Sequence, residues 1–181
     1  MKTFSQVLIL GLFSFSSAMA LTVPNFRSVT DEIFRSARPS KADLQQLKSD
    51  NQLRTIIDLE DDSTAVTLEQ ESADQLGIKF YSFPMSAFAP PSDSQVQEIL
   101  KTLENPNLQP ILLHCHHGED RTGMIFGLYR VLHDNWGANS AYQEMLSDGF
   151  HPALKYLDQY FKSKSGFNQE NSSETMAVSE F

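Results

Sequence analysis

The sequence predicts an α/β domain in which a central mixed, mostly parallel sheet of about four to five strands is flanked by helices. Short β-branched and apolar segments alternate along the chain with segments whose apolar residues recur at helical spacing. The length of 181 residues, 40% of them hydrophobic, suits one domain with a substantial core. We find no internal repeat and no sign of a second domain in the sequence.

The first predicted elements are a short strand, a helix and a longer strand. Residues 33–37 have the pattern of a strand, which Pro39 ends. Ser40 can cap the helix that follows, and this helix continues to Lys48. The segment "LRTIIDL", residues 53–59, is β-branched and apolar, which is typical of a buried strand.

A second helix, a strand and a third helix follow in the middle of the chain. The apolar spacing of residues 63–76 predicts a helix, and Gly77 is placed to terminate it. The segment "IKFYSF", which follows this glycine directly, is the next strand. After a proline-containing loop, residues 96–103 carry apolar side chains at helical spacing, with Ser92 or Asp93 as the cap.

The remaining chain contributes one strand and three helices. The short apolar run "PILLHC", residues 110–115, forms the last predicted strand. Residues 122–136 have an almost wholly apolar face, which predicts a helix buried in the centre. Two more helices are expected at residues 140–146 and 152–161, and residues 166–181 form a polar tail that we expect to be disordered.

Residues 1–20 have the pattern of a secretory signal peptide. An early cation at Lys2 precedes an apolar run, and small residues follow up to Ala20, after which we expect cleavage. The apolar run is shorter than the about 20 residues that span a bilayer, so a transmembrane anchor is disfavoured. We therefore expect an exported protein, periplasmic or secreted, without stable membrane insertion after cleavage.

The chain is acidic, with 23 Asp and Glu against 14 Lys and Arg and a formal net charge of −9. Such a charge repels nucleic acid and anionic membranes at long range, so neither is an expected partner. Because Cys115 is the single cysteine, no internal disulfide can form, even outside the cytoplasm. We expect a monomer.

That cysteine lies in the segment "HCHHGEDRTG", residues 114–123. A strand that ends at Cys115, a tight turn at Gly118 and a helix that begins near Thr122 place the thiol below a helix N-terminus. Consecutive backbone N–H groups of such a loop form an anion cradle, and the helix dipole favours the thiolate. Arg121 can lay its planar guanidinium over the cradle and bind two phosphate oxygens at once. The segment therefore predicts a nucleophilic cysteine in an anion-binding loop.

The same segment matches the pattern HCxxGxxR[ST]G at every fixed position, and in this it resembles the cysteine-based phosphatases of the protein-tyrosine and dual-specificity superfamily. The segments "IFRSARPS", "TIIDLED" and "ILLHC" are similar to the small dual-specificity-like phosphatases of bacteria, plants and fungi. The resemblance implies a dual-specificity phosphatase-like fold, with residues 21–165 as the phosphatase catalytic domain and no cofactor. In many of these proteins an arginine follows the second strand where this chain has Glu60, so the resemblance supplies no phosphate contact at that position.

The resemblance further implies hydrolysis of a phosphate monoester in two steps. The Cys115 thiolate attacks phosphorus to give a phosphocysteine, a general acid protonates the leaving oxygen, and water then cleaves the intermediate. Arg121 and the loop amides hold the equatorial oxygens. By the same analogy His114 orients the loop near the cysteine, and the Thr122 hydroxyl stabilises the departing thiolate. The residues expected to bind substrate are His114, His116, His117, Gly118, Glu119, Thr122 and Gly123.

Two positions compete for the general acid. Asp120 stands immediately before the arginine, as in myotubularin-like lipid phosphatases and bacterial phosphatases with a "GKDRTG" loop, where it reaches the leaving oxygen without loop closure. Tyrosine-specific relatives carry an aspartate on a loop ahead of the cysteine, where this chain has Asp93 and, as a weaker candidate, Asp62. We favour Asp120, although a carboxylate there can also serve only to tie down the loop. Asp93 can equally be a helix cap.

The loop departs from the "GKDRTG" pattern at Glu119, which stands where those relatives have lysine. Protonated His116 and His117 can compensate for this negative charge, since imidazole titrates near pH ~6.5, and this predicts a mildly acidic optimum. The alternative is that both are exposed residues of the loop rim without a charge role. His133 and His151 are expected to serve packing or surface roles.

Other interpretations of the segment are weaker. Neighbouring side chains of an extended strand point to opposite faces, so residues 114–117 cannot converge on one ion, and we predict no metal site. A redox role would need a resolving cysteine, which the sequence lacks. A sulfurtransferase also uses a cysteine in an anion-binding loop, and a non-enzymatic phosphate-recognition module would share the fold but lose Cys115 or Arg121. Arg35 is expected to form a salt bridge to an acidic strand end rather than to touch substrate.

The substrate stays open between phosphotyrosine proteins and inositol polyphosphates or other small phosphomonoesters. Asp120 inside the loop and the flanking histidines favour the small phosphomonoesters slightly. The acidic surface is poorly suited to docking on a membrane of phosphoinositides.

Overall fold

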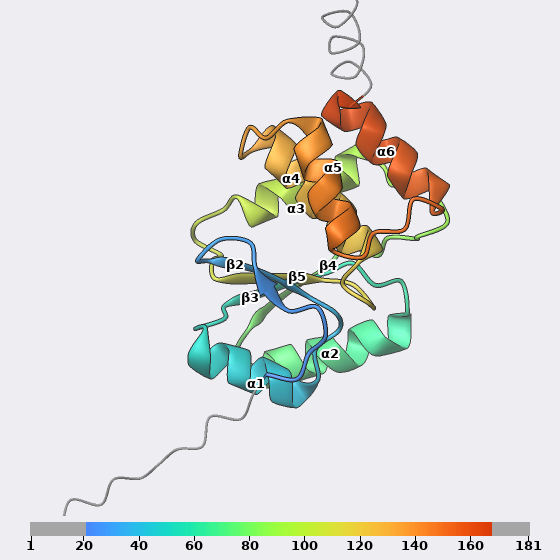
Figure 1. The fold of residues 1–181 in the computed structure, drawn as a ribbon. Coiled ribbons are helices and arrows are strands. Elements are labelled where there is room, and N and C mark those ends of the chain that lie inside the picture. Colours follow the sequence, from blue (N-terminus) through green and yellow to red (C-terminus); the bar gives the residue numbers. More distant parts are fainter. Residues whose placement is uncertain (1–20, 168–181) are drawn as a thin grey trace, which may run out of the picture.

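In the computed structural model, which describes residues 21–167, five strands form one sheet (Figure 1). The strands are β1 (Arg27–Ser28), β2 (Ile33–Ser36), β3 (Thr55–Asp58), β4 (Lys79–Ser82) and β5 (Ile111–His114). The helices are α1 (Lys41–Asp50), α2 (Ser63–Leu76), α3 (Asp93–Leu103), α4 (Asp120–Leu132), α5 (Ala138–Ser147) and α6 (Lys155–Ser165). The predicted signal peptide, and the predicted tail beyond residue 167, lie outside the described residues.

The strand order of the sheet is β1-β2-β5-β3-β4. β1 pairs with β2 in antiparallel fashion, and β2, β5, β3 and β4 pair in parallel. This confirms the predicted mixed, mostly parallel sheet. Because the parallel strands all end at one edge, the segments that follow Ser36, Asp58 and His114 meet there, where open α/β sheets usually bind ligands.

Helices cover both faces of the sheet, with α1 and α2 on one face and α3, α4, α5 and α6 on the other (Figure 1). Side chains alternate between these faces along each strand. On the central strand β5, Leu112 packs in the cluster of α1 and α2, whereas Ile111 and Leu113 pack in the larger cluster of α3 to α6. The same alternation sends His114 toward α2 and Cys115 toward α4.

Helix α4 passes through the larger apolar cluster, as its sequence predicts. Its residues from Thr122 to Tyr129 are all buried. A Cβ at Gly127 would overlap Met145 on α5 and would crowd Phe161 on α6. This glycine therefore allows both helices to pack closely on α4.

Both ends of α4 differ from the predicted range of residues 122–136. The helix begins at Asp120, since the Glu119 carbonyl already accepts a helical hydrogen bond at 2.7 Å. It ends at Leu132, and the chain turns soon afterwards, where Asn135 adopts a left-handed φ of 58°. The apolar face therefore predicts the helix but not its ends.

The helix caps follow the predicted residues. Ser40 caps α1 and Ser92 caps α3, each by accepting a backbone N–H of the first turn. Gly77 ends α2 with a φ of 63°, a conformation that glycine adopts easily. Strand β1 is not predicted, because its two exposed residues carry no apolar pattern.

The packed chain extends past the predicted domain end at residue 165. The ring of Phe167 lies 5.0 Å from that of Tyr142 and 6.5 Å from that of Phe161, measured between centroids. Within residues 21–167, no helix combines the length and the apolar character that crossing a membrane requires.

Candidate active site

A cavity of about 490 Å³ is lined by the segment that follows β5 and by two further loops. Six of the ten predicted site residues line it: Cys115, His116, His117, Glu119, Asp120 and Arg121. The other lining residues are Ala87, Phe88, His151, Ala153 and Leu154. The cavity therefore brings together the predicted nucleophile, the predicted acid and the predicted phosphate-binding arginine.

Cys115 lies between the end of β5 and the start of α4, and only 2% of its surface is exposed. The thiol is free, and the residue lines the cavity while packing in the larger apolar cluster. The N-terminus of α4 directs partial positive charge toward this place, which favours a bound anion beside the sulfur. A molecule in the cavity is thus within reach of a sulfur that is otherwise enclosed.

The loop keeps its shape by packing against the segment that ends β2. Gly118 has a φ of 73°, and a Cβ at this residue would overlap the backbone of Ser36 and Ala37. The buried side chain of Arg35 donates from Nη2 to the Gly118 carbonyl at 2.8 Å and also pairs with Asp148. Arg35 thus forms a salt bridge, as predicted, but with the residue that ends α5 rather than with a strand end.

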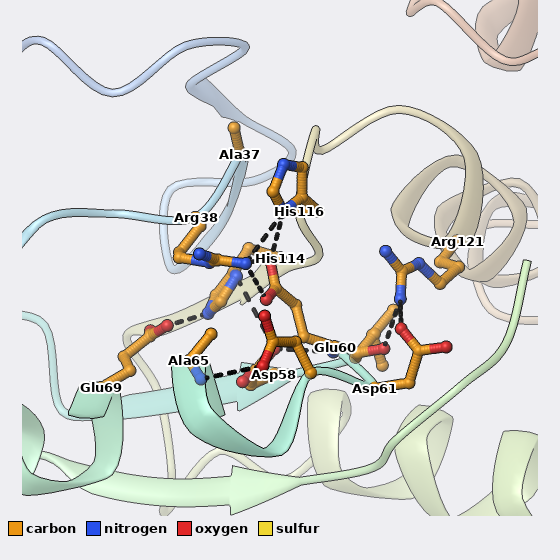
Figure 2. A network of polar contacts seen from close by, with 12 residues as sticks. Ala37, Arg38, Asp58, Glu60, Asp61, Ala65, Glu69, His114, His116 and Arg121 are labelled. Atoms are coloured by element: carbon orange, nitrogen blue, oxygen red, sulfur yellow. Dashed lines mark hydrogen bonds and ion pairs between the residues drawn. The ribbon is translucent and has the colours of Figure 1, made fainter. Parts of the chain in front are cut away.

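Arg121 is held by acceptors from two loops (Figure 2). Its Nη1 donates to the carbonyls of Leu59 at 3.3 Å and Met85 at 3.0 Å, and to Asp61 Oδ1 at 2.9 Å. The side chain is only 11% exposed. Residues 21–167 give the other guanidinium nitrogens no such acceptor, which leaves them for an anion in the cavity.

Thr122 and Gly123 lie inside α4 and do not line the cavity, and Gly118 does not line it either. Thr122 is completely buried, and its Oγ1 has no hydrogen-bond partner within residues 21–167. The hydroxyl is therefore free for the role that the resemblance implies. Gly123 packs beside Phe150 and Arg35.

His114 lies on the opposite side of the strand from the cavity, because its side chain alternates with that of Cys115. Its buried ring places Nε2 2.8 Å from Glu69 Oε1 and Nδ1 3.8 Å from Asp58 Oδ1 (Figure 2). Burial disfavours the charged imidazole, but Glu69 above all, then Asp58 and Cys115, outweigh it and raise the pKa of His114 to about 9. His114 is thus a buried cation at neutral pH. It does not line the cavity, so it is not placed to bind substrate there, and it lies below the loop that the resemblance expects it to orient.

Glu69 and Asp58 surround His114 below the loop, and the sequence analysis missed both. Both are buried, and Glu69 reaches His114 from helix α2. Burial raises the pKa of Asp58 to about 6, although His114 opposes this rise. A carboxylate inside the apolar run of residues 53–59 is a signal in the sequence for Asp58, whereas nothing in the pattern of α2 marks Glu69.

Asp120 is bound by His151, which lies between α5 and α6. Its Oδ1 accepts the backbone N–H of His151 at 2.7 Å and lies 3.1 Å from the ring Nδ1. His151 therefore belongs to the site and does more than the predicted packing or surface role. His133, in contrast, stacks on Tyr129 at 4.5 Å and pairs with Asp134, outside the cavity.

The competing aspartates are engaged elsewhere. Asp93 accepts hydrogen bonds from Lys164 at 2.6 Å and Tyr160 at 3.0 Å, and these two contacts lower its pKa. Asp62 is the N-cap of α2. Neither lines the cavity, so Asp120 is the candidate acid that the cavity contains.

The segment before β1 also contacts the loop. Asn25 donates from Nδ2 to the carbonyl of His117 at 2.9 Å and to Glu119 Oε1 at 3.1 Å. The negative side chain of Glu119 is thereby held at the rim of the cavity.

Two groups of side chains bring ligand-type atoms within 4.8 Å of one another: Asp58, Glu69 and His114, and Glu119, Asp120 and His151. In each group the histidine already pairs with a carboxylate, Glu69 in the first and Asp120 in the second. Ion pairs account for both groups, and we assign a metal to neither.

A buried cysteine after a central parallel strand, an arginine at the start of the next helix and a cavity between them define the class of cysteine-based phosphatases. The chain belongs to the tyrosine phosphatase family, which it matches over residues 20–177.

Two of the curated relatives show what the chain is similar to. The chain is 35% identical over 144 residues to inositol diphosphatase SIW14 of Saccharomyces cerevisiae, a match that covers 76% of this chain and 49% of the relative. It is 30% identical over 130 residues to dual specificity protein phosphatase TpbA of Pseudomonas aeruginosa, which covers 70% of this chain and 55% of the relative. The chain thus spans about half the length of these proteins.

Solved structures of the same two proteins share the fold. The core catalytic domain of SIW14 matches with a TM-score of 0.71 at 25% identity, and covers 87% of this chain and 96% of that one. TpbA matches with a TM-score of 0.67 at 24% identity, and covers 83% of this chain and 92% of that one. The predicted dual-specificity phosphatase-like fold is therefore confirmed.

Proposed function

We propose that this chain hydrolyses phosphate monoesters through a phosphocysteine intermediate. The observation that carries the proposal is the shared cavity of Cys115 and Arg121 at the N-terminus of α4. A sulfur anion and a planar guanidinium then face the same bound phosphate from two sides. Membership of the tyrosine phosphatase family supports this chemistry.

The first step transfers the phosphoryl group to sulfur. The Cys115 thiolate attacks phosphorus, the bond from phosphorus to the leaving oxygen breaks, and Asp120 gives that oxygen its proton. Arg121 and the loop N–H groups hold the equatorial oxygens, where negative charge is spread in the transition state. In the second step water attacks phosphorus and gives a proton to Asp120, the bond to sulfur breaks, and inorganic phosphate leaves.

The lining of the cavity favours a substrate with an aromatic group next to the phosphate. Arg121 is the arginine of this lining, and Glu119, which Asn25 holds at the rim, opposes a substrate with many negative charges. Phe88 is 78% exposed at the cavity and, together with Ala87, Ala153 and Leu154, offers an apolar wall. Since aromatic rings pack well on one another, phosphotyrosine is our first candidate substrate.

Inositol polyphosphates are the second candidate substrate. Three histidines line the cavity and offer ring nitrogens as hydrogen-bond partners for further phosphate groups: His116, His117 and His151. The match to a curated inositol diphosphatase adds to this support.

The decisive assay is release of inorganic phosphate from a phosphotyrosine peptide and from inositol hexakisphosphate between pH 5 and 8. We expect faster turnover of the peptide at pH 7, no turnover by Cys115→Ser, and retained phosphate binding by that variant. Phe88→Ala should raise KM for the peptide and leave KM for inositol hexakisphosphate unchanged. Binding without hydrolysis by the wild type would indicate a phosphate-recognition module, and sulfur transfer from thiosulfate to Cys115 a sulfurtransferase.

The identity of the general acid is tested by two aspartate variants. Asp120→Asn should lower kcat about 100-fold, which is typical for loss of a positioned acid. Asp93→Asn should change kcat less than twofold, because Asp93 is bound to Lys164 and Tyr160 on α6. The reverse order would make Asp93 the acid.

We also propose that the chain is exported and acts as a monomer. The support for export is the signal-peptide pattern of residues 1–20. Cell fractionation and N-terminal sequencing should find a mature chain that begins at Leu21 outside the cytoplasm. Light scattering on that chain should give the mass of one copy.

A further inference from the structure

We propose that Arg38, held by the buried carboxylate of Glu60, positions His116 as a neutral imidazole that donates from Nε2 to a phosphate oxygen in the cavity. This inference rests on the proposed hydrolysis and adds two positioning residues, Arg38 and Glu60, to the candidate site.

The three residues come from three segments that meet at one edge of the sheet (Figure 2). Arg38 follows β2, Glu60 follows β3 and His116 follows β5. Arg38 donates from Nε to Glu60 Oε1 at 3.0 Å and from Nη2 to Glu60 Oε2. Its backbone N–H also donates to the His116 carbonyl at 3.2 Å. The arginine is thus tied both to the acid and to the loop.

Glu60 fixes the charge and the place of Arg38. The Glu60 side chain is 2% exposed, and a buried carboxylate of this kind requires a paired cation. The hydrogen bonds that Arg38 donates to Glu60 are the main cause that raises the pKa of Arg38, so the guanidinium stays charged. Bidentate pairing also restricts its orientation.

The orientation of Arg38 decides which ring nitrogen of His116 carries the proton. Arg38 Nη2 lies 2.8 Å from His116 Nδ1. A guanidinium has no acceptor, so Nδ1 must accept and the proton of the neutral ring is on Nε2. His116 is 51% exposed and lines the cavity, where this N–H is a donor for an anion.

The groups near the His116 ring differ in whether they favour a proton on Nδ1. Glu60 Oε1 lies 3.5 Å from the same Nδ1 and favours a proton there, and the ring of His117 meets that of His116 edge-on at 4.3 Å. Arg38 opposes a proton on Nδ1, because the N–H groups of Arg38 Nη2 and of His116 Nδ1 would then point at each other. While Arg38 is in place, His116 therefore supplies a hydrogen bond rather than the predicted positive charge.

The arrangement also gives Glu60 a role at the candidate site. The acid holds a guanidinium at this edge of the sheet, from the segment after β2. A cation from another part of the chain thereby lies near the loop.

Nitrogen-15 NMR of the histidine rings tests the proposal without any turnover. In the resting wild type at pH 7 we expect His116 with Nδ1 unprotonated and Nε2 protonated. In Arg38→Met, Nδ1 should become protonated beside Glu60. A protonated Nδ1 in the wild type would overturn the proposal, and that readout stands even if the variant does not fold or the protein hydrolyses nothing.

Kinetics with p-nitrophenyl phosphate give the second test. Arg38→Met should raise KM about 10-fold at pH 8, which is the loss of one hydrogen bond to a charged group, and much less at pH 5.5, because an imidazole without a guanidinium partner is in general a donor at both nitrogens in acid. The kcat value should stay within twofold. In a His116→Ala background the same substitution should leave KM unchanged. An equal, pH-independent effect in both backgrounds would overturn the proposal.

Arg130→Met is the matched control. Arg130 also pairs with carboxylates, those of Glu144 and Asp134, at a place that does not line the active cavity. Its loss should lower Tm and leave KM and its pH dependence unchanged. A rise of KM in this control as well would show that loss of any such ion pair disturbs the loop.

Discussion

Two histidines flank Cys115, one on each side, and they lie in opposite surroundings. His114 is completely buried below the loop, with the carboxylates of Glu69 and Asp58 around it. His116 is half exposed at the rim, beside an arginine that a buried acid already holds. Below the loop the histidine is itself the cation, because the two nearby carboxylates raise its pKa to about 9.

The comparison shows how the partner decides what a histidine contributes. The carboxylates around the buried ring keep it positively charged at neutral pH, whereas a guanidinium beside the exposed ring makes it a neutral donor. The alternation of side chains along β5 separates the two rings, and the shared edge of the parallel strands supplies each with its partners. One loop thereby has a permanent charge below the sulfur and a directed N–H above it.

The largest loss of activity is expected at Gly118, the residue of the loop that packs against the end of β2. A Cβ there overlaps the backbone of Ser36 and Ala37, so Gly118→Ala must shift the loop. Such a displacement of a catalytic loop lowers kcat/KM about 100-fold. Gly77→Ala is the control, because φ is positive at this residue too. Its Cβ would meet only the end of the Lys48 side chain, at 3.6 Å. The stability of this variant should fall, and its kcat/KM should stay unchanged. Equal kinetic losses in both variants would mean that the Gly118 contact is not special.

The buried side of the comparison is tested by Glu69→Gln. This substitution leaves the enclosed cation of His114 without its nearest partner, which typically costs about 3 kcal/mol of stability. Urea unfolding at pH 7 measures the loss. The control Glu71→Gln changes an exposed residue of the same helix and should cost less than about 0.5 kcal/mol. A similarly small loss of stability in both variants would contradict the interpretation of His114 as a buried cation.

The pH dependence of stability also tests the surroundings of the buried His114. The pKa of His114 rises from 6.5 to about 9 on folding, so its contribution is full below pH 6.5 and is lost as the pH rises through 9. The shift corresponds to about 3 kcal/mol. Asp58, whose pKa rises from 3.8 to about 6, weakens the fold as the pH rises between those values. Urea unfolding from pH 5 to 10 should therefore show a free energy of unfolding that declines at alkaline pH, and Glu69→Gln should make this decline smaller. A wild-type free energy that stays constant at alkaline pH would contradict the raised pKa of His114.

The smallest expected effect separates the two rim histidines. His117 meets the ring of His116 edge-on and, within the described residues, has no arginine at its own ring. His117→Asn should remove most of the decrease of KM between pH 7.5 and 5.5, by about threefold for one exposed charge. His116→Asn should raise KM at every pH. The opposite assignment would place the acidic response on His116.

The sequence predicts the sheet, the helices and the loop because each has a local signal. The apolar runs before Cys115 and after Thr122 give the central strand and the buried helix, and the spacing from the cysteine to Arg121 gives the anion site. Strand β1 and the ends of α4 depend on single turns and pairings that carry no such pattern.

The partners of the site residues could not be predicted, because they are far apart in the sequence. Glu69 meets His114 only when α2 packs on the sheet, and His151 meets Asp120 through the loop after α5. The pairing of Arg38 with Glu60 depends likewise on the strand order. Such contacts are set by the tertiary fold, and a residue type in a local pattern does not reveal them.

The central claim, that Cys115 captures the phosphoryl group, is tested most directly by trapping the intermediate. The protein is mixed with p-nitrophenyl phosphate and quenched in acid within milliseconds, and the peptide that contains Cys115 is analysed by mass spectrometry. The account predicts a phosphoryl group on this cysteine, formed in a burst with nitrophenol release and absent from Cys115→Ser. Steady hydrolysis by the wild type with no phosphorylated cysteine at any time, or hydrolysis by Cys115→Ser, would contradict it.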